Sequence, residues 1–469
     1  MKIEQLTGKS VLVLGLGLEG RSALGLLRET LPGNTLAVAD QHDWDHLSSE
    51  TRALLERDSA LVRHIGPDYL ESIRQYDVIV KSPGIPVILP QYQEAVRLGK
   101  IITSPTAIFF ANFPGMIVGI TGTKGKSTTA SLIAAVLRKQ FPDTALIGNI
   151  GKPALDVLPS LRDRKDAIVV YELSSHQLEG LRQSPHIAVL LNIVPEHLDY
   201  YTSFDEYVAA KENITRFQTE RDFLVYDADH EIPQRIAMQS RARKMACSIH
   251  GLDSHSRGRC FVYNDWIAYE SESREPDLIV PTSDIPLLGS FNRINVAAAV
   301  AVGKLLGVPS EAIAAAVQEF QPLTHRLERV GEFGGVAYYN DSIATVPEAA
   351  VAALDALAGS VDTILLGGAD RGLDFSGLAA GLARRAVKTV ILFPPTGERI
   401  WKAVCNHDAD AAARMKHFFV DSMEEAVRLA KLHTAPGKCC LLSPASPSFG
   451  LFRDYRERGD RFKQLVRGE

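Results

Sequence analysis

Cysteine is scarce in this sequence, which also contains no long apolar run and no basic tract. The 469 residues include five scattered cysteines and no CxxC pair, so we expect free thiols in a reducing compartment. No run of about 18 apolar residues occurs, and the opening MKIEQLTGKS has no apolar signal-peptide core. With 51 basic and 56 acidic residues, the charge balance favours a protein that binds neither nucleic acid nor membranes. We therefore expect a cytoplasmic protein.

The residues that are present indicate a globular chain of several domains. The chain is 46% hydrophobic and 23% charged, an ordinary composition, and its length suits roughly two to four domains. Apolar strands alternate with helical stretches in three successive blocks, which is typical of parallel sheets with crossover helices. Pro105 and the QPLTHR stretch interrupt this alternation. The predicted fold is α/β, with a Rossmann-like domain over 1–105, a central P-loop ATPase-like sheet over 106–322 and a second Rossmann-like domain over 323–469.

A glycine-rich turn follows the first apolar stretch, SVLVLGLGLEG. Gly15, Gly17 and Gly20 fit GxGxxG between a predicted strand and a predicted helix, and Asp40 follows twenty residues later. In dinucleotide-binding domains such glycines admit a pyrophosphate at the helix N-terminus, and the acidic residue binds a ribose hydroxyl. The pattern is compatible with an NAD-dependent enzyme, but a lone GxGxxG is more often a tight strand-to-helix turn.

A second loop, TGTKGKST, follows the apolar run MIVGI and indicates a triphosphate site. Its glycines allow backbone amides to curl around phosphate oxygens, its second lysine supplies a positive charge, and the serine hydroxyl is a Mg²⁺ ligand. Ile120 stands where the general pattern GxxxxGK[ST] has glycine. ATP is the ligand that the loop favours, the alternative being a structural turn. The predicted ATP-binding residues here are Gly122, Thr123, Lys124, Gly125, Lys126, Ser127 and Thr128.

This loop and a series of later motifs resemble the Mur ligases, which add amino acids to the UDP-linked peptidoglycan precursor. The later motifs are YELSSHQLE, LNIVPEHLDYY, AAKENI, GSFNRINVAAA, LTHRLE, YNDS and LLSPASPSFGLFRDYRERGDRF. The GLGLEG turn and the SPGI stretch are similar to those of the glutamate-adding ligases of the family. The resemblance implies that the first domain holds the UDP end of a sugar nucleotide, which displaces the NAD interpretation.

Two predicted strand ends carry candidate metal ligands. Glu172 follows the apolar run AIVVY and His197 follows LLNIV, so both are expected at the sheet edge where ligands gather. Taken singly, each has a structural explanation, as a salt bridge or a surface histidine. The resemblance implies that both bind Mg²⁺ with Ser127, and that Lys211 is carbamylated and adds an anionic ligand. The implied catalytic residues are Lys126, His197, Lys211 and Asn149.

Further ATP contacts are expected outside the loop. Asn292 and Asn295 lie three residues apart, so they share a helix face that can read the adenine edge, with helix capping as the alternative. The resemblance places Arg326 at the γ-phosphate after domain closure and Asp341 at the ribose. His325 is expected to act as a hinge residue and not as a catalyst.

The resemblance also implies contacts to two substrates, UDP-N-acetylmuramoyl-L-alanine and glutamate. The UDP group is expected at Gly15, Leu18, Glu19, Asp40, Ser82, Pro83 and Gly84. Glutamate is expected at Thr345, Arg371, Ser448 and the backbone near Tyr455.

The amino-acid site departs from the usual D-glutamate pattern. Ile343 stands where that pattern has lysine, and Arg371 lies near the position of another lysine. A planar guanidinium holds a carboxylate in a different orientation from that set by a lysine ammonium group. The NDSIAT, DRG and SPxxPSFGxxRDY stretches resemble a smaller sister group that adds L-glutamate. We expect L-glutamate, with D-glutamate as the alternative.

The expected reaction is an ATP- and Mg²⁺-dependent amide ligation through an acyl phosphate, catalysed by a monomer. Phosphoryl transfer requires positioned cations more than covalent help. His197 and nearby carboxylates are both candidates for the base that deprotonates the amine. Folylpolyglutamate synthase shares the ATP motifs but should lack the glycine-turn domain that precedes them here. A nucleotide-binding regulatory protein with a degenerate site is a second alternative, disfavoured by the intact lysine, glutamate and histidine set.

Overall fold

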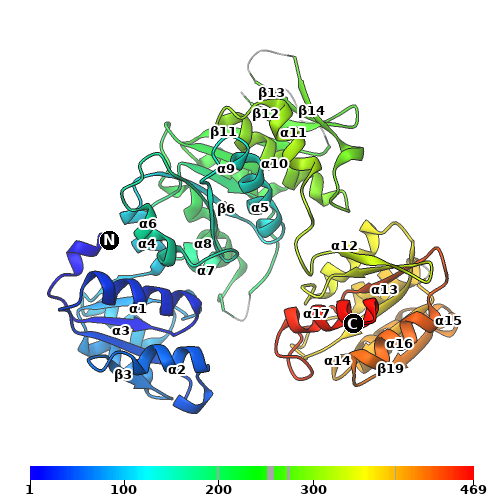
Figure 1. Ribbon diagram of the computed structural model, residues 1–469, viewed down its shortest axis with the longest axis horizontal. Helices are drawn as coiled ribbons and strands as arrows, with labels where there is room; N and C mark the ends of the chain where they lie inside the picture. Colours follow the sequence, from blue (N-terminus) through cyan, green and yellow to red (C-terminus); the bar gives the residue numbers. More distant parts are fainter. Residues whose placement is uncertain (198–199, 251–257, 272–274, 386) are drawn as a thin grey trace. The chain divides into compact units, whose positions relative to one another are not determined.

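The computed structural model describes residues 1–197, 200–250, 258–271, 275–385 and 387–469. Three sheets flanked by helices make up the chain (Figure 1), which confirms the predicted α/β class. The chain divides into two compact units, one of residues 1–284 with 293–318 and one of residues 285–292 with 319–469. The first unit contains two of the sheets. No helix within the described ranges is long and apolar enough to cross a membrane.

Five parallel strands form the first sheet, in the order β3-β2-β1-β4-β5. They are β1 (Val11–Leu14), β2 (Leu36–Asp40), β3 (Val62–Ile65), β4 (Val78–Lys81) and β5 (Ile101–Thr103). Strands β1, β2 and β4 are buried along their whole length, as parallel strands covered on both faces must be. The helices are η1 (Ile3–Leu6), α1 (Leu18–Thr30), η2 (Trp44–His46), α2 (Ser49–Glu56), η3 (Tyr69–Gln75) and α3 (Pro90–Arg97). The strand order reverses between β1 and β4, so the loops after these strands border a crevice at the carboxyl edge.

Nine strands form the second sheet, in the order β14-β13-β12-β11-β10-β9-β6-β8-β7. They are β6 (Met116–Thr121), β7 (Ala145–Gly148), β8 (Ile168–Glu172), β9 (Ile187–Leu190), β10 (Phe223–Asp227), β11 (Arg243–Ser248), β12 (Arg259–Tyr263), β13 (Trp266–Glu270) and β14 (Asp277–Pro281). The pairing is parallel from β7 to β12 and antiparallel between β12, β13 and β14. Strand β6 therefore lies inside the parallel part, with its carboxyl end pointing to the same edge as β8 and β9.

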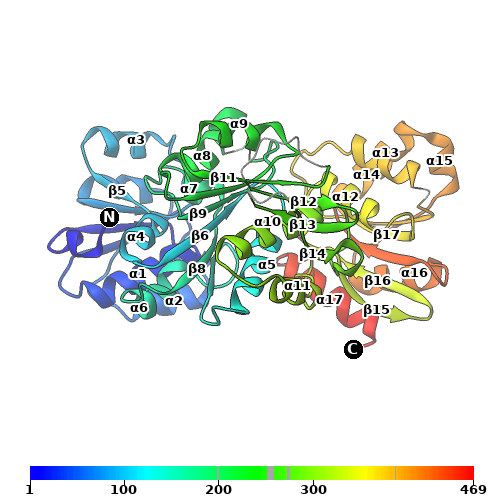
Figure 2. The same ribbon diagram turned by 90° about the horizontal axis from the view of Figure 1, so that it is seen from above.

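Helices cover both faces of this second sheet. They are α4 (Pro105–Asn112), α5 (Lys126–Arg138), α6 (Ala154–Leu161), α7 (Ser175–Leu178), α8 (Phe204–Arg216), α9 (Glu231–Gln239), η4 (Thr282–Asp284), α10 (Phe291–Leu305) and α11 (Ser310–Gln318). Figure 2 shows α8 and α9 on one face and α5 and α11 on the other. Helix α4 begins where Pro105 predicted a break, because Pro105 occupies the first turn and the Ser104 hydroxyl accepts a hydrogen bond from Ala107 N.

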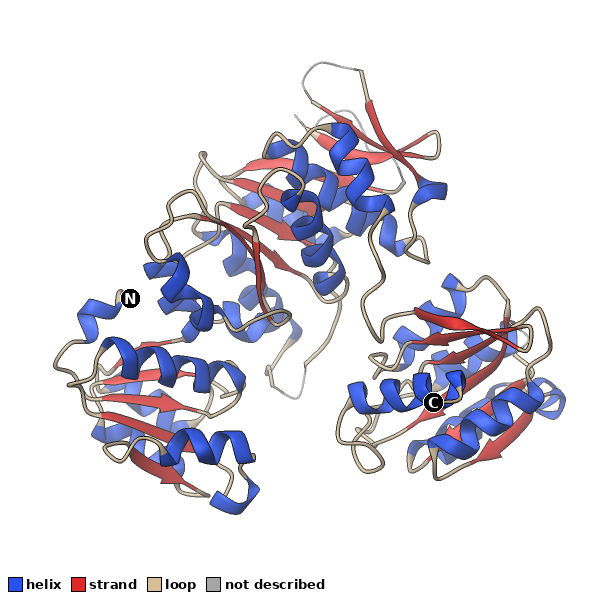
Figure 3. Ribbon diagram, in the orientation of Figure 1, coloured by secondary structure: helices blue, strands red, loops and turns tan. Residues whose placement is uncertain are grey.

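The third sheet belongs to the second unit and has the order β15-β16-β20-β17-β18-β19. Its strands are β15 (Glu328–Phe333), β16 (Val336–Asn340), β17 (Val361–Gly367), β18 (Thr389–Phe393), β19 (Lys416–Phe419) and β20 (Cys439–Leu442). Its helices are α12 (Pro347–Ala356), α13 (Ser376–Arg384), α14 (Thr396–His407), α15 (Ala409–Arg414), α16 (Met423–His433) and α17 (Tyr455–Arg467). All pairs are parallel except β15 with β16, and helices lie over the sheet in Figure 3. The loops after β16, β20 and β17 therefore meet at one edge.

Candidate active site

The TGTKGKST loop connects β6 to the start of α5. Gly125 caps this helix in the left-handed region, with φ of +85°, and a Cβ there would lie 2.5 Å from Asn295 Oδ1. Both facts require glycine. Lys126, Ser127 and Thr128 form the first turn of α5, so their backbone N–H groups lack helical acceptors. A glycine turn that presents free N–H groups at a helix N-terminus fits the phosphates of a nucleotide.

The segment after β9 supports the phosphate loop. Thr123 N donates to Asn192 O over 2.6 Å, and the Thr123 hydroxyl lies 3.0 Å from the Tyr207 hydroxyl. The Lys124 ammonium forms an ion pair with Glu196 at 2.5 Å. The next residue, His197, is exposed and has φ of +58°. The carboxyl ends of β6 and β9 thus hold the phosphate loop and His197 in one neighbourhood, as the sequence predicted.

Two lysine side chains meet at the carbonyl of Gly122. Lys126 Nζ donates to it over 3.0 Å and Lys211 Nζ over 2.8 Å, and Lys126 also donates to Thr123 O over 2.9 Å. Lys211 lies on α8 and is only 1% exposed. Burial, and then the nearby positive charge of Lys126, lower the pKa of Lys211 well below its usual value. This position therefore favours the uncharged amine of Lys211 more than water does.

Glu172, the last residue of β8, supplies a buried carboxylate beside these lysines. It is 1% exposed, and its charge contributes to the electrostatics of Lys211. Asn149, which follows β7, donates to Glu172 Oε1 over 3.4 Å, whereas Glu172 Oε2 is buried without a hydrogen-bond partner. A buried, unpartnered carboxylate oxygen at the phosphate end of a sheet fits a divalent cation. Of the predicted Mg²⁺ ligands, Glu172 is the one whose buried carboxylate oxygen has no hydrogen-bond partner in the described chain.

In the first sheet, the predicted UDP residues converge on the crevice between β1 and β4. The Ser82 hydroxyl donates to Gly15 O over 2.8 Å, which ties the two loops together. Asp40 at the end of β2 is 7% exposed, and it accepts a hydrogen bond from Leu16 N over 2.7 Å. The neighbouring Leu18 is 58% exposed. The structure thus places Asp40 as the residue that holds the glycine turn, with its second oxygen 2.7 Å from the His42 ring.

Glu19 and Lys81 connect this crevice to the second sheet. Gln177, next to the end of α7, donates to Glu19 Oε1, and Lys81 Nζ lies 3.5 Å from Glu179 Oε2. The Tyr200 hydroxyl donates to the same Glu179 oxygen over 2.8 Å. Burial raises the pKa of Glu19 to about 7, and the hydrogen bond from Gln177 opposes this rise. The YELSSHQLE segment therefore contacts both predicted UDP-binding loops.

The two helix asparagines take different positions. Asn295 in α10 is 3% exposed and accepts a hydrogen bond from Thr129 Oγ1 over 3.0 Å, so it packs directly against the phosphate-loop helix. Asn292 donates to Leu288 O over 2.6 Å within its own segment. The structure thus brings the Asn295 side chain into contact with the phosphate-loop helix.

In the second unit, Arg326 is held between two residues with left-handed backbone. His325 has φ of +65° and Leu327 has φ of +44°, an unusual pair for non-glycine residues. Leu327 N donates to Asp341 Oδ1 over 3.1 Å, and burial raises the pKa of Asp341 to about 7 against the charge of Arg326. Arg326 and Asp341 are therefore neighbours within this unit.

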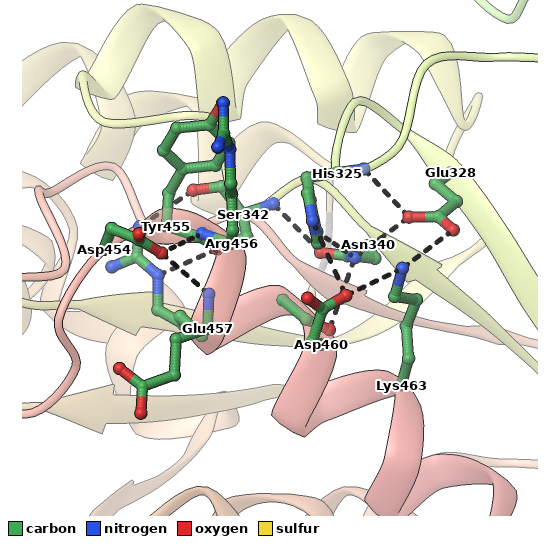
Figure 4. Close-up of polar contacts among 12 residues, drawn as sticks. His325, Glu328, Asn340, Ser342, Asp454, Tyr455, Arg456, Glu457, Asp460 and Lys463 are labelled. Atoms are coloured by element: carbon green, nitrogen blue, oxygen red, sulfur yellow. Dashed lines mark hydrogen bonds and ion pairs between the residues drawn. The ribbon is translucent and has the colours of Figure 1, made fainter. Parts of the chain in front are cut away.

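His325 belongs to a polar cluster that joins the LTHRLE segment to α17 (Figure 4). Its ring lies 3.0 Å from Asn340 Nδ2 and 3.6 Å from Asp460, and His325 N donates to Glu328. Lys463 pairs with both Glu328 and Asp460. Burial and the charge of Lys463 lower the pKa of His325. These contacts fit a residue that fixes the backbone of the LTHRLE segment.

The predicted glutamate residues lie on loops at the carboxyl edge of the third sheet. Thr345 is on the loop after β16, the exposed Arg371 on the loop after β17 and the buried Ser448 on the loop after β20. The last two loops are joined by a hydrogen bond from Ala369 N to Pro447 O over 2.8 Å. Within the described chain, no hydrogen bond or ion pair engages the Arg371 side chain. Tyr455 O accepts a hydrogen bond from the Ser342 hydroxyl over 2.8 Å. The predicted residues are thus gathered at one edge.

Comparison with known proteins agrees with this geometry. Residues 120–303 match the model of the Mur ligase middle domain, and residues 325–446 match the model "Mur ligase, glutamate ligase domain". The chain belongs to the Mur ligase family. Members of this family are ATP-dependent ligases that form amide bonds, so the predicted enzyme class is confirmed.

Two curated relatives align with this Mur ligase over nearly their whole length. The UDP-N-acetylmuramoylalanine--D-glutamate ligase of Symbiobacterium thermophilum is 36% identical over 455 residues, which cover 97% of each chain. The UDP-N-acetylmuramoyl-L-alanine--L-glutamate ligase of Xanthomonas euvesicatoria pv. vesicatoria is 34% identical, over 99% of this chain and 97% of the relative. The crystal structure of the UDP-N-acetylmuramate-alanine ligase MurC of Thermotoga maritima shares the fold, with a TM-score of 0.60, 18% identity and coverage of 98% and 99%.

Several residues of this Mur ligase site were not predicted from the sequence. They are Lys81, Gln177, Glu179 and Tyr200 at the contact between the first two sheets, and Arg458 below the loops of the third sheet. Each lies inside a stretch that the family resemblance covers, so the motifs were found but the roles of these side chains were not. The signal that was available is charge inside apolar surroundings, as in VIVKSPG, where a lysine ends a buried strand.

Proposed function

We propose that this Mur ligase joins L-glutamate to UDP-N-acetylmuramoyl-L-alanine in peptidoglycan precursor synthesis, as a cytoplasmic monomer. The proposal rests on the presence of two different sites in one chain. One is a phosphate loop with two lysines on the carbonyl of Gly122, and the other is a sheet edge where the exposed cation Arg371 lies on a loop bonded to that of Ser448. The names of both curated relatives specify glutamate and an N-acetylmuramoyl-alanine nucleotide, which supports the substrates.

The proposed reaction proceeds through an acyl phosphate. A carboxylate oxygen of the alanyl group attacks the γ-phosphorus of ATP, and the bond to ADP breaks. The glutamate amine then attacks the acyl carbon and loses a proton, and the tetrahedral intermediate expels phosphate. Lys126 would neutralise charge on the transferred phosphoryl group, and His197 and nearby carboxylates are the candidate bases. Mg²⁺, when bound, would balance phosphate charge next to Glu172, Ser127 and His197.

Lys211 is proposed to carry a carbamate. Two ammonium groups on one carbonyl repel each other, and a neutral amine is the form that reacts with CO₂. Carbamylation would replace the second positive charge by a negative one beside the catalytic cation Lys126. The change would also give the Mg²⁺ site a second anionic ligand besides Glu172.

The remaining substrate contacts are proposed from the family resemblance and from the local geometry of each unit. Asn149 would orient ligands near the phosphates, with Asn292 and Asn295 at the adenine, and Arg326 and Asp341 at the γ-phosphate and ribose. The crevice of the first sheet would hold UDP through Gly15, Leu18, Glu19, Asp40, Ser82, Pro83 and Gly84. The domain boundaries 1–105, 106–322 and 323–469 stay part of this proposal.

D-glutamate is the second candidate substrate. The name of the Symbiobacterium thermophilum relative, at 36% identity, favours it. Ile343 and Arg371 favour the L isomer. Ile343 removes one lysine of the usual D-glutamate pattern, and Arg371 has a planar guanidinium near the position of another.

Phosphate release from ATP, measured with each substrate alone and with both substrates together, tests the ligase proposal. With UDP-N-acetylmuramoyl-L-alanine and glutamate together, phosphate and ADP should form in equal amounts with one amide product. Turnover with a folate acceptor instead of the sugar nucleotide would support a folylpolyglutamate synthase. No acceptor-dependent phosphate release with either acceptor would contradict both ligase assignments.

A further inference from the structure

Arg458 is a completely buried arginine at the start of α17. Its relative exposure is 0%, and it is first by volume among the fully buried side chains of the described residues. None of the carboxylates in the described chain forms an ion pair with it. Its position in the first turn of α17 is also unfavourable, because the N-terminal end of a helix repels positive charge. A buried cation without a counter-ion has a large desolvation cost and requires an explanation.

All three guanidinium nitrogens donate to the loops that carry the proposed glutamate residues. Nε donates to the Ser342 hydroxyl over 3.0 Å and Nη2 to Ser342 O over 2.8 Å, on the loop after β16. Nη1 donates to Ser446 O over 3.1 Å, on the loop after β20. The acceptors are therefore neutral oxygens, which satisfy the hydrogen bonds but do not cancel the charge.

The third loop at this edge also lies against Arg458. At Gly368, after β17, a Cβ would be 3.2 Å from Arg458 Nη1 and 2.1 Å from Pro447 O. Gly368 N donates to the Thr396 hydroxyl over 2.9 Å, and this hydroxyl lies 2.9 Å from that of Ser446. The guanidinium is thus enclosed by the loops that carry Thr345, Arg371 and Ser448.

Burial lowers the pKa of Arg458 to about 9, so the guanidinium still carries its charge at neutral pH. In surroundings from which water is excluded, such a charge acts over several ångströms with little screening. The exposed Arg371 on the same edge is screened by solvent, so the two cations differ in how far their fields reach.

We propose that the buried charge of Arg458 is balanced by a carboxylate of the bound amino acid, so that Arg458 is a positioning residue that selects an anionic amino acid. This inference rests on the proposed function, because it assumes that glutamate binds at this edge. Nε, Nη1 and Nη2 each already donate to Ser342 or Ser446, so Arg458 would act on the substrate through its charge and not through a direct contact. Its contribution would be a field that favours a carboxylate where the three loops meet.

The test compares glutamate with two analogues that each lack one negative charge, glutamine and the α-amide of glutamate. The variants are Arg458→Met, Arg458→Lys and, as a matched control, Arg453→Met, whose side chain is 81% exposed in the same segment. In wild type and variants, kcat/KM is measured for the three amino acids at saturating ATP and sugar nucleotide. Circular dichroism establishes that each variant is folded.

The charge role predicts a selective effect. Arg458→Met should lower the preference for glutamate over at least one analogue by a factor of ~10 or more, which corresponds to about 1.4 kcal/mol. Arg458→Lys, which retains the charge, should keep the preference within a factor of ~3, and Arg453→Met should not change it. If Arg458→Met does not fold, the result for Arg458→Lys is used instead. Loss of the preference for glutamate over the analogues in Arg458→Lys would overturn the assignment.

An equal loss for all three amino acids in Arg458→Met would also overturn the assignment, because it would show that Arg458 only holds the loops in place. Absence of glutamate-dependent turnover in the wild-type enzyme would be a different result. It would contradict the proposed function and not the comparison between variants.

Discussion

At the scale of single residues, the side-chain nitrogens of two lysines donate to one carbonyl oxygen, that of Gly122. Lys126 is half-buried and donates to carbonyls of its own loop, whereas Lys211 is fully buried on another helix. The two residues therefore have different predicted roles, one as a permanent cation and one as a modified ligand.

Lys126→Ala should reduce turnover by a factor of ~10²–10³, the usual effect of removing one preorganised charge from a transition state. The fold should persist, because the Lys126 side chain is only half-buried and belongs to the phosphate loop and not to the hydrophobic core. Phosphate release at saturating ATP measures the effect, with the exposed Lys165→Ala as the matched control. Activity close to wild type would contradict the phosphate role of Lys126.

Lys211→Ala should be inactive and partly rescued by formate or acetate, since a small carboxylate can replace the carbamate next to the cation. The lowered pKa of Lys211 moves protonation of its amine to lower pH, so loss of the carbamate and of activity should occur at more acidic pH than for an ordinary lysine. Labelling with ¹³C-bicarbonate and NMR detects the carbamate directly. Full activity of the alanine variant, or no carbamate signal in wild type, would show that Lys211 is unmodified.

Arg371→Lys should raise the glutamate KM by a factor of at least ~10, about 1.4 kcal/mol, because an ammonium group cannot form the two parallel hydrogen bonds of a guanidinium. The preference between the isomers should also become weaker. The neighbouring Arg399→Lys is a suitable control, since Arg399 forms an ion pair with Asp370 on the same loop. An unchanged KM would remove Arg371 from the amino-acid site.

At the scale of elements, the contact between α1 and the α7 segment links the crevice of the first sheet to the phosphate end of the second. Glu19 and Lys81 lie next to the glycine turn and the SPG loop, and their partners Gln177 and Glu179 follow shortly after Glu172 in the chain. One short segment therefore spans from the proposed metal ligand to the proposed UDP loops. This arrangement allows binding at the crevice to influence the phosphate site.

Glu19→Gln should change the pH dependence of stability. Glu19 has its pKa raised to about 7 in the fold, so between pH 4.5 and 7 the folded chain keeps a proton that the unfolded chain loses. The free energy of unfolding should therefore fall as pH rises through this window, by roughly 1 kcal/mol per pH unit, and the glutamine variant should lack this decline.

Urea unfolding of both proteins at pH 5, 6 and 7 measures this difference. The exposed Glu29→Gln on the same helix is the control. A stability difference between wild type and Glu19→Gln that does not vary with pH would show that Glu19 is ionised throughout.

The elements could be predicted where their signals are local. The apolar run before Thr121 and the glycines after it determine a strand, a turn and a helix within about a dozen residues. The β12–β13 hairpin was not predicted, although Asn264 and Asp265 supply its left-handed turn.

The contacts of the site were harder to predict, because they join residues far apart in the chain. Gln177 and Glu19 are separated by 158 positions, and Arg458 and Ser342 by 116. No local pattern specifies such pairs. Ser127, Glu172 and Lys211 were identifiable because a family motif surrounds each of them, whereas Arg458 lies in a quoted motif without a signal for its burial.

At the scale of the whole molecule, the parallel strands of each of the three sheets end in loops that carry one part of the proposed site. The first sheet carries the UDP residues, the second the phosphate loop and the third the amino-acid residues. Ligands gather at the carboxyl edges of such sheets, so the fold provides one edge for each of the three substrates of a ligase. The order of the motifs along the chain predicts the same assignment of one proposed substrate to each sheet.

The central claim is that this Mur ligase adds glutamate and prefers the L isomer. Its most direct test is turnover of purified enzyme with ATP, Mg²⁺ and UDP-N-acetylmuramoyl-L-alanine, with L-glutamate or D-glutamate supplied separately and the amide product identified by chiral analysis after hydrolysis. We predict product with glutamate only when ATP is present, and a higher kcat/KM for L-glutamate. Exclusive use of D-glutamate would contradict the isomer assignment, and no product with either isomer would contradict the claim as a whole.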